Sequence, residues 1–92
     1  MDEISVGCVV YSLSGRDSGR YYVIVKLEDG YAYIVDGNLR KLKNPKKKNM
    51  KHLRSSGRVL TTIADKFNTG KKVFDTEVNS ALREFNDKGM EV

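Results

Sequence analysis

The stretch YYVIVKL-EDG-YAYIV, residues 21–35, decides the fold of this 92-residue chain. Residues 21–27 and 31–35 are rich in Tyr, Val and Ile, whose aromatic or branched side chains pack well on the pleated surface of a sheet. Between them stands Asp29-Gly30, a pair that tolerates the positive φ angles of a tight hairpin turn. The sequence therefore predicts two antiparallel strands joined by this turn.

Further short strands are expected on both sides of this hairpin. Residues 6–11 are again rich in β-formers, and a glycine-containing loop over 12–20 leads from them to the hairpin. Residues 39–42 and 50–53 are candidates for a fourth and a fifth strand, separated by a predicted loop in which three consecutive lysines repel one another. Such short strands with frequent turns predict a mainly β unit over residues 1–54, a small barrel or sandwich.

Residues 55–92 have a helical pattern instead. One apolar stripe recurs at helical spacing and consists of Leu60, Ile63, Ala64 and Phe67. A second stripe, in a helix expected from about residue 77 to 88, consists of Val78, Ala81, Leu82 and Phe85. The expected N-caps are Ser55 or Ser56 for the first helix and Thr76 for the second. Because both stripes are too small to fold alone, we expect a two-helix extension that packs on itself, on the strands or on a partner.

Composition excludes several classes of function. No apolar run approaches the roughly 20 residues that a membrane-spanning helix needs, and the acidic N-terminus is unlike a secretory signal. Cys8 is the one cysteine, so no internal disulfide forms, and with a single histidine no Cys/His metal site is expected. No carboxylate pair or nucleophile–base set emerges. The sequence therefore predicts a cytoplasmic protein that is not an enzyme and uses no cofactor or small-molecule substrate.

Positive charge is concentrated in the middle of the chain. Residues 38–64 contain no acidic side chain and nine basic ones, which leaves eight of the 17 Lys and Arg residues to balance all 12 acidic residues elsewhere. This one segment therefore carries the whole excess behind the net charge of +5. Charge concentrated in this way attracts polyanions. The alternative is a solvated lysine loop that only aids solubility.

The loop between the first two predicted strands is a second candidate site. Gly15 and Gly19 permit a tight backbone path, and Arg16 and Arg20 are suited to phosphate contacts. It is not a nucleotide-binding P-loop, since the Gly-Lys-Ser/Thr signature and the following helix are missing. The alternative is an ordinary hairpin with solvated arginines. Among the five tyrosines, Tyr22 beside Arg20 is our candidate for stacking on an unpaired base, against the alternative of a buried ring.

The sequence VVYSLSGRDSGR, residues 9–20, is followed by a β-run that ends in VDG. It resembles the KOW motif, whose loop has the form glycine-basic-Asp-x-Gly-basic and is shared by ribosomal proteins and transcription elongation factors. The later NMKHL, residues 49–53, is similar to the end of the KOW domain in the archaeal and eukaryotic fourteenth large-subunit ribosomal protein and in small bacterial proteins of that group. The resemblance implies an SH3-like five-stranded barrel and RNA or ribosome binding. Ser18 departs from it, because many relatives have another basic residue there.

The hypothesis from sequence is therefore binding of structured RNA, ribosomal RNA in particular, with ribosomal proteins as further candidate partners and no membrane contact. The expected RNA-binding residues are Arg16, Arg20, Tyr22, Arg40, Lys41, Lys43, Lys46, Lys47, Lys48, Lys51 and Arg54. The alternative is a protein-interaction module that docks through its apolar helices in a ribosome or transcription complex. Exposure of Leu60, Phe67, Leu82 and Phe85 would favour that alternative.

Overall fold

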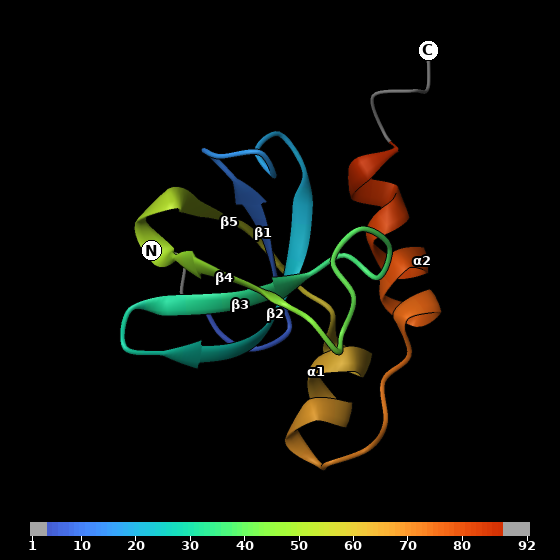
Figure 1. Cartoon of the computed structure of the whole chain (residues 1–92). Helices are drawn as coiled ribbons and strands as arrows, with labels where there is room; N and C mark the ends of the chain where they lie inside the picture. The colour runs from blue at the N-terminus through green and yellow to red at the C-terminus, as the bar shows by residue number, and fades with distance from the viewer. Residues whose placement is uncertain (1–3, 88–92) are drawn as a thin grey trace.

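Five antiparallel strands and two helices make up the part of the chain that the structure, a computed structural model, describes: residues 4–87 (Figure 1). The order along the chain is β1 (Cys8–Ser12), β2 (Tyr21–Glu28), β3 (Tyr31–Val35), β4 (Lys46–Asn49), the 3₁₀ turn η1 (Met50–His52), β5 (Leu53–Val59), α1 (Thr61–Asn68) and α2 (Asp75–Asn86). The prediction of a mainly β fold with two C-terminal helices is confirmed.

The strands form a single sheet in the order β4-β3-β2-β1-β5. The chain turns back through β1, β2 and β3, and β5 then returns to pair with β1. Within residues 4–87 no ladder joins β4 to β5, so the sheet has two edges and is not closed into the barrel that the sequence predicted. Instead, η1 links the two edge strands, and the backbone N–H of Leu13 donates to the carbonyl of His52 at 2.9 Å.

Apolar side chains are buried on both faces of this sheet. One face, called the inner face, carries the inner core, which is made of Cys8, Val10, Tyr22, Ile24, Ala32, Ile34 and Leu53. The opposite face, called the outer face, carries Val9, Val23 and Val35, which pack against Ile63 of α1 and against Val78 and Leu82 of α2. Successive residues of a strand point to opposite faces, so the near-continuous apolar runs of β1 and β2 supply both cores. The helices pack on the sheet, one of the three arrangements that the sequence left open (Figure 1).

Two segments differ from the predicted strands. Residues 39–42 form turns, because the Asp36 side chain accepts hydrogen bonds from the backbone N–H groups of Asn38 (2.9 Å) and Arg40 (2.8 Å) and draws the chain into a tight bend. The lysine run predicted as a loop is strand β4, paired with β3 from Lys46↔Ile34 to Asn49↔Tyr31. Alternation sends Lys47 to one face and its two lysine neighbours to the other, which separates charges that the linear sequence places together.

The starts of the last three elements also differ from the prediction. Residues 50–53 contain η1 in place of a strand, and β5 continues to Val59, past the predicted boundary at residue 54. Ser55 and Ser56 therefore lie inside β5 and cap no helix. Helix α2 begins after Phe74, not after Thr76, and the Glu77 carboxylate accepts from the Phe74 backbone N–H at 3.3 Å.

A close approach between the β3–β4 loop and α2 fixes the helix on the sheet. Gly37 has φ +78°, and a Cβ there would lie 2.7 Å from the backbone nitrogen of Asn79 and would collide with the carbonyl of Asp75. Gly37→Ala should destabilise the protein by at least about 3 kcal/mol, because both a strained φ and a helix displacement are imposed. Gly30→Ala is the matched control, since Gly30 has φ +80° and open space around it.

The control should destabilise the protein by only about 1–2 kcal/mol, the effect of the backbone conformation alone. Chemical denaturation of the two variants measures the difference. Equal losses of stability would mean that the contact between Gly37 and α2 does not constrain the fold.

Candidate nucleic-acid interface

The loop over residues 13–20 is a tight extension of the β1–β2 hairpin. The backbone N–H of Ser12 donates to the carbonyl of Arg20 (3.1 Å), and the N–H of Gly19 donates back to the carbonyl of Ser12 (3.0 Å). Gly15 and Gly19 have φ +87° and +85°, so the sequence-based reason for these glycines holds. The loop leaves Arg16 exposed and Arg20 half-buried. The Arg16 guanidinium is therefore carried by a loop whose base is held by two backbone hydrogen bonds.

An ion pair ties this loop to the edge strand β4. Lys48 Nζ lies 2.8 Å from Asp17 Oδ1, and it also donates to the carbonyl of Ser14. The two charged side chains are only 8% and 13% exposed. Lys48 points to this side because it pairs with Ala32, a member of the inner core. Lys48 thus has a structural position, and little of its side chain is exposed for the RNA contact that the sequence predicted.

Tyr22 also has a structural position. Its side chain is 2% exposed within the inner core, and its hydroxyl donates to the carbonyl of Asp17 at 3.3 Å. Burial raises the pKa of the Tyr22 phenol, and the carboxylates of Asp17 and Asp36 raise it further, while Arg20 and Arg40 oppose them. The enclosed Tyr22 ring is a core residue, with almost no exposed surface for the base stacking that the sequence predicted. Arg20 and Arg40, which come from separate loops, thus both act on the pKa of the Tyr22 phenol.

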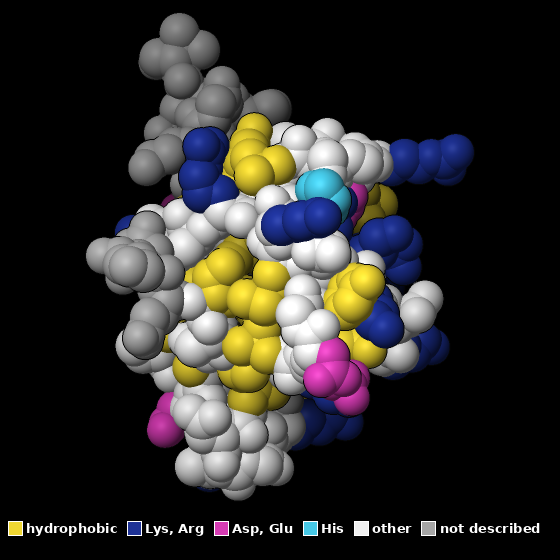
Figure 2. Space-filling model, turned by 90° about the vertical axis from the view of Figure 1, so that its left-hand side faces the viewer, with side chains coloured by type: hydrophobic (Ala, Val, Ile, Leu, Met, Phe, Trp, Pro, Cys, Tyr) yellow, Lys and Arg dark blue, Asp and Glu magenta, His cyan; other side chains and the backbone are white. Residues whose placement is uncertain are grey.

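The remaining cations do not form one continuous surface. Lys46 is half-buried and shares the sheet face of Lys48, whereas Lys47 projects from the opposite face of β4. Lys41 and Lys43 are exposed on the β3–β4 loop, and Lys51 is exposed in η1. In the view of Figure 2, most Lys and Arg side chains lie on the right-hand side of the molecule and others lie near the top, while hydrophobic side chains form a band down the middle.

Sequence reasoning missed a pairing of tyrosines with lysines on the outer face of β2, β3 and β4. Lys47 Nζ lies 4.7 Å from the centroid of the Tyr31 ring, and Lys26 Nζ lies 5.3 Å from that of Tyr33. Tyr31 is 37% exposed. We call these four residues the tyrosine–lysine face. The period-two spacing of Tyr31 and Tyr33 was a usable signal, because it places both rings on one side of a strand.

A second row of aromatic rings crosses the sheet toward α2. The Tyr11 and Tyr21 centroids lie 5.0 Å apart, and Tyr21 lies 5.5 Å from Phe85 of α2. Arginines stand at both ends: Arg54 is 5.7 Å from the Tyr11 centroid and Arg58 is 5.4 Å from that of Phe85. Arg54, an expected RNA-binding residue, is exposed. All three rings are half-buried, so the row mainly fixes α2 to the sheet.

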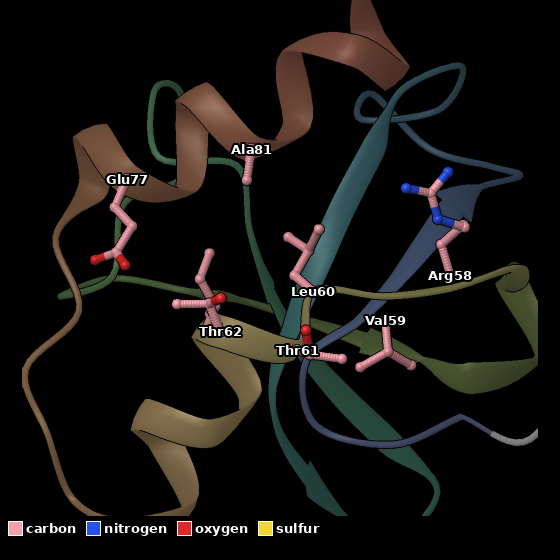
Figure 3. A pocket seen from close by; sticks show the side chains of 8 residues that line it. Arg58, Val59, Leu60, Thr61, Thr62, Glu77 and Ala81 are labelled. Atoms are coloured by element: carbon pink, nitrogen blue, oxygen red, sulfur yellow. The ribbon is translucent and has the colours of Figure 1, made fainter.

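A groove of about 400 Å³ separates the start of α1 from α2 (Figure 3). Its lining residues are Arg58, Val59, Leu60, Thr61, Thr62, Ile63, Glu77 and Ala81. The carboxylate in this lining is held by Lys66 Nζ at 2.6 Å, and that hydrogen bond, followed by the one from the Phe74 N–H, lowers the pKa of Glu77. A carboxylate occupied in this way is poorly suited to general acid–base chemistry.

The described part of the chain contains no group of three or more His, Cys, Asp or Glu side chains placed to hold a metal ion. Among the same residues, no helix is long and apolar enough to cross a membrane. Cys8 is buried, as expected for a small apolar residue, and His52 is exposed. Between residues 4 and 87, three side-chain atoms are buried without a hydrogen-bond partner: Asp17 Oδ2, Asp36 Oδ2 and Arg20 Nε.

Comparison with known proteins leaves the chain without an assigned family. No protein-family model matches the sequence, and no curated protein is significantly similar to it.

The Lys48–Asp17 pair yields a stability prediction. Lys48→Met should cost about 3 kcal/mol, because it leaves the Asp17 carboxylate largely buried and unpaired. The double variant Lys48→Met/Asp17→Asn should be more stable than Lys48→Met alone, since the uncompensated charge is gone. Lys47→Met, on the exposed face of the same strand, is the control and should cost less than about 1 kcal/mol. Urea denaturation checks all three, and a Lys48→Met variant as stable as the control would contradict a structural role for the pair.

Proposed function

We propose that this protein binds structured RNA, in the first place ribosomal RNA, mainly through phosphate contacts. The observation that carries the proposal is the Lys48–Asp17 ion pair, which joins the loop over residues 13–20 to strand β4. Through it, the loop that carries the exposed Arg16 is joined to the strand that carries Lys46 and Lys47. Cations held in fixed positions lose little conformational entropy when a polyanion binds.

Phosphate contacts suit this arrangement better than base reading. Lysine is a flexible point charge that gives affinity and orientation without sequence information. Specificity would then come from RNA shape and from a stacked base, for which the exposed ring of Tyr31 on the tyrosine–lysine face replaces the buried Tyr22. Lys47 beside that ring supplies a charge for the adjoining phosphate.

Part of the fold supports the resemblance to KOW proteins. A small barrel requires its first strand to pair with its last, and β1 pairs with β5 here. The motif loop over residues 15–20 joins β1 to β2, at the position that the resemblance implies. We therefore propose an SH3-like arrangement of the KOW type, open between β4 and β5, in a cytoplasmic protein associated with ribosomes and without a cofactor or catalytic activity.

The apolar stripes of the two helices, the docking surface that the alternative of a protein-interaction module requires, are largely covered within the protein. Leu82 is fully buried, and Leu60, Phe67 and Phe85 are half-buried against the outer face of the sheet. The apolar stripes of the helices are thus used inside the molecule. A pull-down from RNase-treated lysate distinguishes the two functions, because a partner that survives the treatment favours protein contact.

Charge reversal on β4 tests RNA binding. The double variant Lys46→Glu/Lys47→Glu should weaken binding to a ribosomal RNA fragment and to unrelated structured RNAs alike, because phosphate contacts are sequence-independent. The slope of log K against log salt should become shallower by about 0.7–0.9 for each phosphate that the variant no longer neutralises. Lys48 is left unchanged so that the fold is preserved.

The control is Lys71→Glu/Lys72→Glu, which makes the same charge change at exposed residues between α1 and α2. Fluorescence anisotropy at several salt concentrations measures both variants. If the two variants lose equal affinity, only net charge matters and β4 is not the site. Salt-independent binding by the unaltered protein would contradict the proposed function itself.

A further inference from the structure

A polar pocket of about 200 Å³ lies at the junction of three segments that are distant in the sequence. The loop over residues 13–20 contributes Arg20, and the β3–β4 loop contributes Asn38. Helix α2 contributes Asn79, Leu82, Arg83 and Asn86, and Asp87 follows directly after it. Polar atoms form nearly all of its lining. None of the polar α2 residues was a candidate from sequence, where this helix was considered only for its apolar stripe.

The pocket is held by contacts that fix α2 against the start of β2. The Asn86 side chain accepts from the backbone N–H of Tyr21 at 2.8 Å and donates to the carbonyl of Tyr21 at 3.1 Å. This pair of bonds sets α2 directly beside Arg20. Asn79, Arg83 and Asn86 are spaced by four and three residues, so they lie on one side of the helix. The pocket is therefore built from fixed elements.

Arg20 has unused hydrogen-bonding capacity at this place. Its Nε is buried and has no hydrogen-bond partner, and no carboxylate of the described residues lies within ion-pair distance of its guanidinium. Among the described residues, the one carboxylate that pairs with Arg83 is that of Asp87, at 3.9 Å and on the surface. A buried donor without an acceptor is unfavourable, so an oxygen-rich ligand that reached Arg20 would relieve it.

We propose that this pocket binds a phosphate group between the guanidinium groups of Arg20 and Arg83. Guanidinium forks match phosphate oxygens in pairs, and the amide of Asn79 or Asn38 adds a neutral donor. A nucleobase fits the pocket less well, because bases need an aromatic or apolar wall and this lining has almost none. Where the phosphate belongs to RNA, the inference rests on the proposed function and makes α2 part of the RNA interface.

Two groups oppose an anion here. The Asp87 carboxylate is negative, and the last turn of α2 carries the partial negative charge of a helix C-terminus. Two guanidinium groups outweigh one carboxylate, but one alone would not. Loss of either arginine should therefore weaken phosphate binding.

Titration of the full chain with inorganic phosphate at constant ionic strength tests the pocket without RNA. The side-chain Nε–H signals of Arg20 and Arg83 should shift in a saturable way in NMR spectra. Arg83→Gln and Arg20→Gln should each weaken phosphate binding about tenfold, the effect of losing one charge-assisted contact. Lys71→Gln, an exposed residue outside the pocket with the same charge change, should leave binding unaltered. Non-saturable shifts, or equal effects of Arg83→Gln and Lys71→Gln, would overturn the proposal.

The RNA fragment of the preceding section then identifies the source of the phosphate. If RNA supplies it, Arg83→Gln lowers RNA affinity, and inorganic phosphate competes with RNA for the wild-type pocket. If Arg83→Gln weakens phosphate binding but leaves RNA affinity unchanged, the pocket takes free phosphate and its place in the RNA interface is refuted. If the wild type binds phosphate but no RNA, the proposed function fails and the pocket stands.

Discussion

The structure depends on one constraint: the central strands bury apolar side chains on both of their faces. In β1, Val9 and Val10 are neighbours, and both are fully buried, one in each core. Consecutive residues of a strand face opposite sides, so such a run requires a cover on each side of the sheet. The curved sheet covers its own inner face, and α1 and α2 cover the outer one. Without the helices, the outer apolar face of β1 and β2 would lie in water, which is why the C-terminal extension belongs to the fold.

The same constraint determines which charged side chains are buried and which stay on the surface. Lys48 lies on the inner face of an edge strand, where its ammonium group is desolvated. Its burial is tolerated only because the Asp17 carboxylate and the Ser14 carbonyl accept hydrogen bonds from it. A buried pair of this kind adds little net stability, since desolvation offsets most of its attraction. It does fix one register of β4 against the loop, because a slip of one residue would bury Lys47 away from Asp17. The pair therefore contributes mainly to the position of the surrounding cations.

Local signals predicted the hairpin well and the site poorly. Strand β3 runs from Tyr31 to Val35 as predicted, because the Asp29-Gly30 turn and the flanking β-formers are contiguous in sequence. The burial of Tyr22 and Lys48 depends instead on Asp17 and on strands that meet only in the folded chain. The lysine run is predicted as a loop because strand propensity ignores the hydrogen bonds that β3 offers. The contact between Asn86 and Tyr21 joins residues 65 apart, beyond the reach of any local pattern.

The cations that remain on the surface differ from Lys48 in a way that matters for binding. Lys47 rests over the exposed Tyr31 ring and Lys26 over the half-buried Tyr33 ring, contacts worth about 0.5–1 kcal/mol each. A charge-assisted hydrogen bond to a phosphate contributes about 1.5–3 kcal/mol. In the proposed complex with RNA, these lysines would therefore leave the rings and free the ring faces for a base. Among the described residues, the Nε of Arg20 has no hydrogen-bond partner to give up. Binding would therefore cost little at both places, because the strong Lys48–Asp17 ion pair lies inside the fold and the surface cations are only weakly held.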